Sequence, residues 1–549
     1  MKVTIRIILG VALAVTANAP AFAGAHGPAQ GSKEVPLFDD LGDHHHAITT
    51  ASPKAQAYFD QGLRLIYAFN HEEANLAFRE ALKHDPDCAM AYWGIAAAKG
   101  PNYNLPMDEA QAKASHEASR KALELAPRVS VPEGDYIAAM ALRYSDDPKA
   151  DRAALDRAYA DAMRALAQKY PKDDDALTLF AESLMNLRPW QLWNKDGTPA
   201  PETLDILAAL ETVLERNAKH AGAIHYYIHS TEASPYPEKA EPYADRLGKL
   251  MPGAGHLVHM AAHTYIRTGR YEDGVRVNIR AADVDRDYIA FRNPQGPYSM
   301  MYYPHNIHFI WSCAAIGGGS RRAISASRDL IDEAPISAIA AMPTMEFVVP
   351  TPYFALVRFG KWEKMLEEPR PPLELQYTTA MWHYARGMSF AGLDQLEPAK
   401  AEAEQLYKIR DAYPADQYIG INFGKSIITV ASSVLGAEVA RKEGKLDEAI
   451  KGFTEAVAVE DTFTYEEPPA WYQPVRLLLG AALLDANRPV DAEAVYREDL
   501  KHYPKNGWAL FGLHQSLQEQ GKKKEARAIK KQFRSAWKRA DVKLASSRF

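Results

Sequence analysis

Cysteine is nearly absent from this chain, which has two in 549 residues, Cys88 and Cys313. So few thiols exclude a fold that depends on a disulfide framework. The two could form one disulfide or bind a metal as thiolates. We favour the third interpretation, in which both are buried free thiols that pack as small hydrophobic residues.

An excess of positive charge is lacking too, since 64 Lys and Arg face 70 Asp and Glu for a formal net charge of −6. This balance gives no support to a nucleic-acid partner. Beyond the N-terminus no long apolar run occurs, so we expect no transmembrane segment in the mature chain. Phosphate loops, nucleophile elbows and dinucleotide fingerprints are also missing, which leaves the enzyme classes that they mark unsupported.

Residues 1–23 have the pattern of a signal peptide. Lys2 and Arg6 precede the apolar stretch 7–17, which is too short to span a bilayer. Small residues then flank Phe22, as at a cleavage site, and no lipoprotein cysteine follows. We therefore predict secretion across the inner membrane, and a periplasmic location if the organism is Gram-negative.

Residues 24–54 are rich in Gly, Pro and Ser, which predicts an irregular N-terminal arm over the first repeat. The arm contains a short histidine run, His44, His45 and His46. It is either a solvated loop or an arm that donates a metal ligand, because short histidine tracts bind metals.

A 34-residue repeat begins at Ala55. Counted from there, small residues occupy positions 8, 20 and 27, large ones positions 4 and 24, and proline position 32: Gly62, Ala74, Ala81, Tyr58, Phe78 and Pro86. Much of this pattern recurs in units that begin at residues 430, 473 and 507. It resembles the tetratricopeptide (TPR) consensus, in which small residues let two antiparallel helices approach closely. Most of the chain is similar to exported bacterial TPR proteins without an assigned activity.

The resemblance implies an all-α TPR solenoid of antiparallel helix pairs in a right-handed superhelix. About 11–12 units would cover residues 55–535, and residues 536–549 would form a basic C-terminal tail. Five units would separate Cys88 from Cys313, far beyond the ~7 Å that a disulfide spans. TPR arrays commonly bind a peptide or protein in their concave groove.

Seven of the eighteen histidines fall between residues 221 and 312, in pairs three or four residues apart. Such spacing places side chains on one face of a helix. Positions 2, 5, 9 and 12 of three successive units hold these histidines and one glutamate: His256, His305, His225, His259, His308, His229, His263 and Glu232. In the TPR family these positions line the groove, so we expect the eight side chains to converge there.

An imidazole-rich cluster favours a transition metal, with copper or zinc preferred and iron or nickel open. A zinc-protease helix is excluded because Tyr226 and Met260 stand where its glutamate would be. A di-iron carboxylate site needs more glutamates than Glu232 alone. The sequence thus predicts a metal-binding groove that could catalyse a metal-dependent reaction. The alternative is a scaffold that binds an acidic peptide or a protein partner without metal.

The sequence also indicates positions for several polar and aromatic residues outside the eight candidate ligands. Glu182 falls near position 9 of its unit and could face the groove. Trp190 and Trp193 could form a rim or lid, although we favour a cover over the core. We expect His71 to help a turn and His383 to pack against its neighbouring helix.

Overall fold

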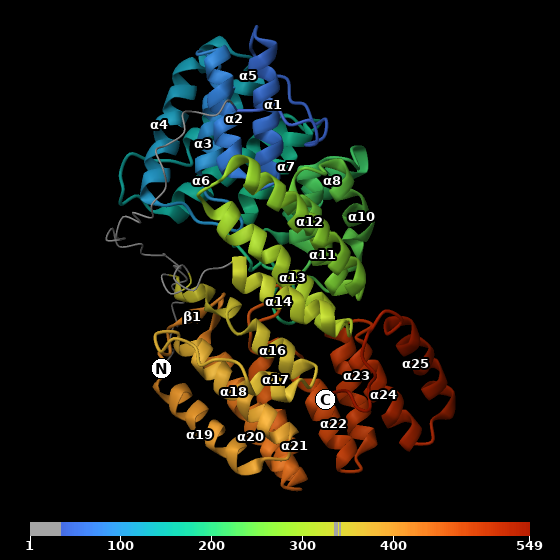
Figure 1. Ribbon diagram of the computed structural model, residues 1–549. Coiled ribbons are helices and arrows are strands. Elements are labelled where there is room, and N and C mark those ends of the chain that lie inside the picture. The colour runs from blue at the N-terminus through green and yellow to red at the C-terminus, as the bar shows by residue number, and fades with distance from the viewer. Residues whose placement is uncertain (1–34, 334–338, 340–341) are drawn as a thin grey trace, which may run out of the picture. The chain divides into compact units, whose positions relative to one another are not determined.

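Helices that pack in consecutive pairs make up nearly all the regular structure of this computed structural model, which describes residues 35–333, 339 and 342–549 (Figure 1). The predicted signal peptide lies outside the described residues. Residues 37–549 cluster as one unit. The prediction of an all-α, TPR-like array of helix pairs is confirmed.

The described helices before residue 220 are α1 (Pro53–Tyr67), α2 (His71–His84), α3 (Ala89–Lys99), α4 (Glu109–Leu125), α5 (Val131–Ala141), α6 (Arg152–Lys169), α7 (Asp174–Met185) and α8 (Thr203–Arg216). The central helices are α9 (Ala221–Thr231), α10 (Glu241–Leu250), α11 (Gly255–Thr268), α12 (Tyr271–Arg292), α13 (Tyr303–Ile316) and α14 (Ser320–Glu333).

The later helices are α16 (Thr351–Arg358), α17 (Trp362–Leu366), α18 (Gln376–Gly392), α19 (Leu396–Ala412), α20 (Gly424–Lys442), α21 (Leu446–Glu460), α22 (Val475–Asp485), α23 (Pro489–His502), α24 (Gly507–Glu519) and α25 (Lys523–Ala536). Short turns of helix are η1 (Ala126–Arg128), η2 (Pro237–Ala240), η3 (Tyr298–Tyr302) and η4 (Pro343–Val348). The described residues contain one two-stranded antiparallel hairpin, β1 (Tyr418–Ile419) with β2 (Asn422–Phe423).

The consensus positions pack as the repeat predicts. A Cβ atom on Gly62 would lie 2.5 Å from the ring of Phe78, and one on Gly480 would lie 2.4 Å from the ring of Tyr496. Both glycines stand at position 8 and both rings at position 24. A larger side chain at position 8 would therefore push the two helices of a pair apart.

The last repeats fold back onto the middle of the chain. The hydroxyl of Tyr271 in α12 donates to the carbonyl of Pro504 at 2.9 Å. Trp508 Nε1 in α24 donates to the carbonyl of Ala315 at 3.2 Å. The array is thus more than a row of nearest neighbours.

The basic C-terminal segment also packs against the protein. Ser547 is fully buried, and its Oγ donates to the carbonyl of Leu477 at 2.8 Å. Arg548 Nη2 lies 2.8 Å from Oε1 of the buried Glu438. Residues 537–549 therefore follow α25 as an ordered return over the core.

Both cysteines are buried free thiols, as predicted. Burial of Cys88 raises the pKa of its thiol to about 11. None of the helices in the described part of the chain is long and apolar enough to cross a membrane.

Candidate metal centre

Three helices bring six of the histidines together, and each is the first helix of its pair. α11 contacts both α9 and α13. The five histidines of α9 and α11 are at most 2% exposed, so they form an enclosed cluster and not the surface of an open groove. The six are His225 and His229 from α9, His256, His259 and His263 from α11, and His305 from α13.

Their nitrogen atoms form two groups of three, each within 4.8 Å. One group is His225, His229 and His256, and the other is His259, His263 and His305. The groups adjoin, because the ring centroids of His229 and His263 are 5.5 Å apart and those of His256 and His259 are 5.7 Å apart. The arrangement suits two ions side by side, one on each group.

Two rings are oriented by oxygen atoms that can only accept a hydrogen bond. His225 Nδ1 lies 2.7 Å from the carbonyl of Tyr67, and His259 Nδ1 lies 2.6 Å from Oδ1 of Asn278. The Asn278 amide is itself oriented, because its Nδ2 donates to the carbonyl of Gly274. Each Nδ1 therefore carries the proton, which leaves a free lone pair on Nε2.

Glu232 orients one histidine in each group. Its Oε1 lies 3.0 Å from His229 Nδ1, and its Oε2 lies 2.5 Å from His263 Nδ1. Burial raises the pKa of this carboxyl, but His263 and His229 outweigh burial and lower it to about 2. Histidines that bind metals commonly donate their other N–H to such an oxygen, which sets the tautomer and the ring orientation.

Sequence reasoning missed a second carboxylate in the cluster. Glu467 lies between α21 and α22, and its Oε2 is 3.0 Å from His263 Nδ1. Burial raises the pKa of Glu467 to about 7, although His263 opposes the rise. The segment has no repeat position that could indicate where it packs, and the acidic pair Glu466-Glu467 was the only local signal. Tyr67 and Asn278 were missed for a related reason, because their roles depend on tertiary contacts.

The Nε2 atoms of His259 and His263 face each other at 2.9 Å. Both Nδ1 atoms are bonded to oxygen, so two lone pairs would repel unless a cation, either a proton or a metal ion, lies between them. Burial lowers the pKa of His263, but Glu232 and Glu467 raise it overall to about 10, which favours a proton in the metal-free protein. Burial and neighbouring histidines hold the pKa values of the other five rings low, so these rings are neutral: His225, His229, His256, His259 and His305.

His308 departs from the predicted cluster. Its ring stacks against Trp311 with centroids 5.4 Å apart and against Phe347 of η4 at 5.5 Å. It belongs to neither group of three ligand atoms among the described residues. A role for His308 as a nearby ligand or as an orienting partner therefore stays a prediction.

Aromatic rings enclose the first group. Phe69 has a left-handed backbone, with φ of 55°, and its ring centroid lies 4.5 Å from that of His225 and 5.5 Å from that of His256. The ring of Trp190 lies 5.7 Å from that of His229. Strained backbone is uncommon for a bulky residue and is concentrated at functional sites. Because the ring of Trp190 lies against that of His229, the insertion that contains Trp190 covers the cluster directly.

The arm histidines surround a different carboxylate. Asp175 Oδ1 lies 3.0 Å from His44 Nε2 and 3.2 Å from His220 Nε2, and Oδ2 lies 2.8 Å from His46 Nδ1. The hydroxyl of Tyr67 donates to Oδ1 at 2.5 Å. Burial raises the pKa of Asp175, yet the three histidines hold it well below its ordinary value. These hydrogen bonds hold the arm against the helices. That the arm donates a metal ligand stays a prediction.

The remaining candidates lie apart from the cluster. His45 bonds Asp60 at 2.8 Å, and His383 Nδ1 bonds Glu402 of α19 at 2.6 Å, which is the predicted packing against the next helix. His71 begins α2, and burial together with Arg143 lowers its pKa to about 4. Glu182 pairs with Arg143 at 4.0 Å and does not contact the histidines among its described partners.

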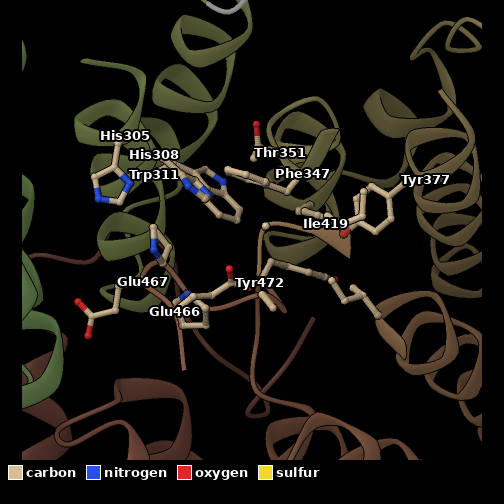
Figure 2. Close-up of a pocket in the computed structure, with 16 residues that line it drawn as sticks. His305, His308, Trp311, Phe347, Thr351, Tyr377, Ile419, Glu466, Glu467 and Tyr472 are labelled. Carbon is tan, nitrogen blue, oxygen red and sulfur yellow. The ribbon is translucent and has the colours of Figure 1, made fainter. Parts of the chain in front are cut away.

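A cavity adjoins the second group of histidines (Figure 2). It holds about 530 Å³ of space without atoms, including solvent at its mouth. His305 and Glu467 line both the cavity and the cluster. In Figure 2, His308 and Trp311 lie on one side and Tyr377 on the other. A molecule in the cavity would thus lie beside the cluster.

No family model and no curated protein matches this sequence. Among solved structures, human IFIT1 with m7Gppp-AAAA is 13% identical, with 89% of this chain and 91% of that chain covered and a TM-score of 0.33. Yeast Tom70 is 10% identical, with 88% and 90% covered and a TM-score of 0.29. Cut9 from the APC/C Cut9–Hcn1 complex is 14% identical, with 89% and 76% covered and a TM-score of 0.29.

The fold is an all-α, TPR-like array. This statement rests on the helix pairs themselves and not on the three similar structures.

Proposed function

We propose that this protein binds two transition-metal ions, copper or zinc, at the two groups of three histidines. One observation carries the proposal: four rings have Nδ1 in contact with an oxygen atom, which turns Nε2 toward the neighbouring histidines of the cluster. Imidazole suits both metals, and ligating histidines are oriented in this way. The N-terminal pattern supports an exported site of action.

Burial of the cluster supports metal over a peptide partner at this place. Five imidazoles at most 2% exposed offer no surface to a docking peptide. Two nitrogen atoms here have no hydrogen-bond partner, namely His229 Nε2 and His256 Nδ1. Buried unpaired polar atoms each cost about 1–3 kcal/mol, and bound cations would offset part of that cost.

The chain's own residues would divide the work of such a centre. Glu232 and Glu467 set the orientation of His263, while Tyr67 and Asn278 do the same for His225 and His259. Phe69 and Trp190 restrict the access of water to the first group. Bound copper would supply redox chemistry, and bound zinc would supply a Lewis acid.

The test is elemental analysis of protein purified without an affinity tag and then exposed to copper or zinc. We expect about two ions per chain, about one in His225→Ala, about one in His259→Ala and none in the double variant. His383→Ala is the matched control, because it removes a largely buried, carboxylate-bonded histidine outside the cluster. Wild-type protein that takes up no metal, or a double variant that binds as well as wild type, would refute the proposal. The control should keep its metal and helix content.

A further inference from the structure

The cavity beside His305 has walls of a consistent chemistry. Aromatic rings dominate them: Trp311, Phe347, Phe354, Tyr377 and Tyr472. The rings of Phe354 and Tyr472 are stacked with centroids 4.5 Å apart and planes 2° apart. Flat, apolar walls favour a planar aromatic ligand.

The charges of the residues that line the cavity restrict the class of ligand that it can bind. None of the residues that line the cavity is Lys or Arg, whereas Glu466 and Glu467 are both present. A carboxylate or phosphate would therefore lose its water without gaining a cation. Glu466 already accepts from Asn422 Nδ2 at 2.8 Å, so it is occupied in fixing the β1–β2 hairpin. An uncharged ligand loses no strongly bound water when it enters the cavity, and it needs no charged partner there.

The indole nitrogen of Trp311 is a buried polar atom of the wall that lacks a hydrogen-bond partner. Trp311 is 3% exposed. An indole N–H is a donor only, so it calls for an acceptor such as a hydroxyl oxygen. The neighbouring His308 is 8% exposed, and its ring stacks on that of Trp311.

We infer that this cavity binds a small uncharged aromatic alcohol, of which phenol is the simplest, with its hydroxyl toward Trp311 and its ring beside His305. The inference deepens the proposed function, because it names the substrate class that would lie next to the metal ions. The walls come from α13, η4, α16, α18, α20, the β1–β2 hairpin and residues 466–472, and among them His305 and Glu467 also belong to the cluster. Because the other lining residues lie outside the cluster, phenol should bind whether or not metal is present.

The experiment is calorimetric titration of the full chain with phenol, toluene and benzoate, on protein as purified and after a chelator. We expect one saturable phenol site and benzoate at least about tenfold weaker. Trp311→Phe should weaken phenol about five- to tenfold while changing toluene less than about twofold, because only phenol uses the N–H. Equal losses for phenol and toluene would contradict the assigned role of Trp311.

Ala470→Leu fills the cavity and should abolish phenol binding. Ala486→Leu is the matched control, because both alanines are partly buried against the same core and only Ala470 lines the cavity. Unchanged phenol binding in Ala470→Leu, or benzoate as tight as phenol, would overturn the inference. Metal content is measured separately, so a protein with metal but no phenol site refutes this inference alone. A protein with phenol bound but no metal refutes the proposed function alone.

Discussion

Replacing Glu232 by glutamine tests the centre without removing any histidine. The carboxylate accepts from His229 Nδ1 at 3.0 Å and lies 2.5 Å from His263 Nδ1, so it orients one ring of each group. A glutamine has one oxygen and one NH₂, and the NH₂ would face an N–H on one of the two rings. That ring must then turn or change tautomer, which displaces its Nε2.

Loss of such an orienting partner typically lowers metal affinity 10- to 100-fold, or about 1.4–2.8 kcal/mol. Because both groups share Glu232, we expect both ions of Glu232→Gln to bind more weakly by a factor in this range. The assay is competition against a chelator of known affinity, with bound metal counted by elemental analysis. The six histidines stay in place, so the number of sites should remain two.

Glu402→Gln is the matched control. Glu402 accepts from His383 Nδ1 at 2.6 Å and from Arg386 Nε at 2.8 Å, far from the cluster in the sequence. The chemical change is the same, and metal affinity should not move. If Glu232→Gln keeps wild-type affinity, or if both variants lose it equally, Glu232 does not orient the ligands as argued.

Three further predictions concern stability. Free metal at 100 times its dissociation constant should stabilise the fold by about 2.7 kcal/mol per site, seen as a higher unfolding midpoint that His225→Ala with His259→Ala abolishes. Arg548→Met should lower the free energy of unfolding, measured with denaturant, by about 2–3 kcal/mol, because it removes one of two arginines from the buried Glu438. The control Arg539→Met removes an exposed arginine and should lower it by under about 1 kcal/mol. Burial lowers the pKa of His46, but Asp175 raises it overall, so the contribution of His46 is present below its unfolded pKa and is lost as the pH rises through the folded value. The lowered pKa of Asp175 contributes above its unfolded pKa, so proteolysis of the arm should be slowest between about pH 4 and 6.5, and Asp175→Asn should remove this dependence.

The repeat made the helix pairs and the approach of α9, α11 and α13 predictable. Position 8 glycines and position 24 rings fix how two helices meet, so matching positions on successive units point the same way. Glu467 was beyond this reasoning because its segment belongs to no repeat position. The stacking of Phe347, from η4, on His308 was beyond it for the same reason. Contacts from Phe69, Trp190 and Glu467 turned an expected groove into an enclosed cluster, and such long-range packing leaves no period in a sequence.

Tyr67 gives the protein a direct connection between the arm and the centre. Its carbonyl accepts from His225, and its hydroxyl donates to Asp175, to which His44 and His46 of the arm also bind. A single residue is thus shared by two binding events, and the free energy of coupling between them is reciprocal. Filling the centre should tighten the arm by the same factor by which a docked arm tightens the metal. Metal binding and docking of the arm would then each favour the other, whichever happens first.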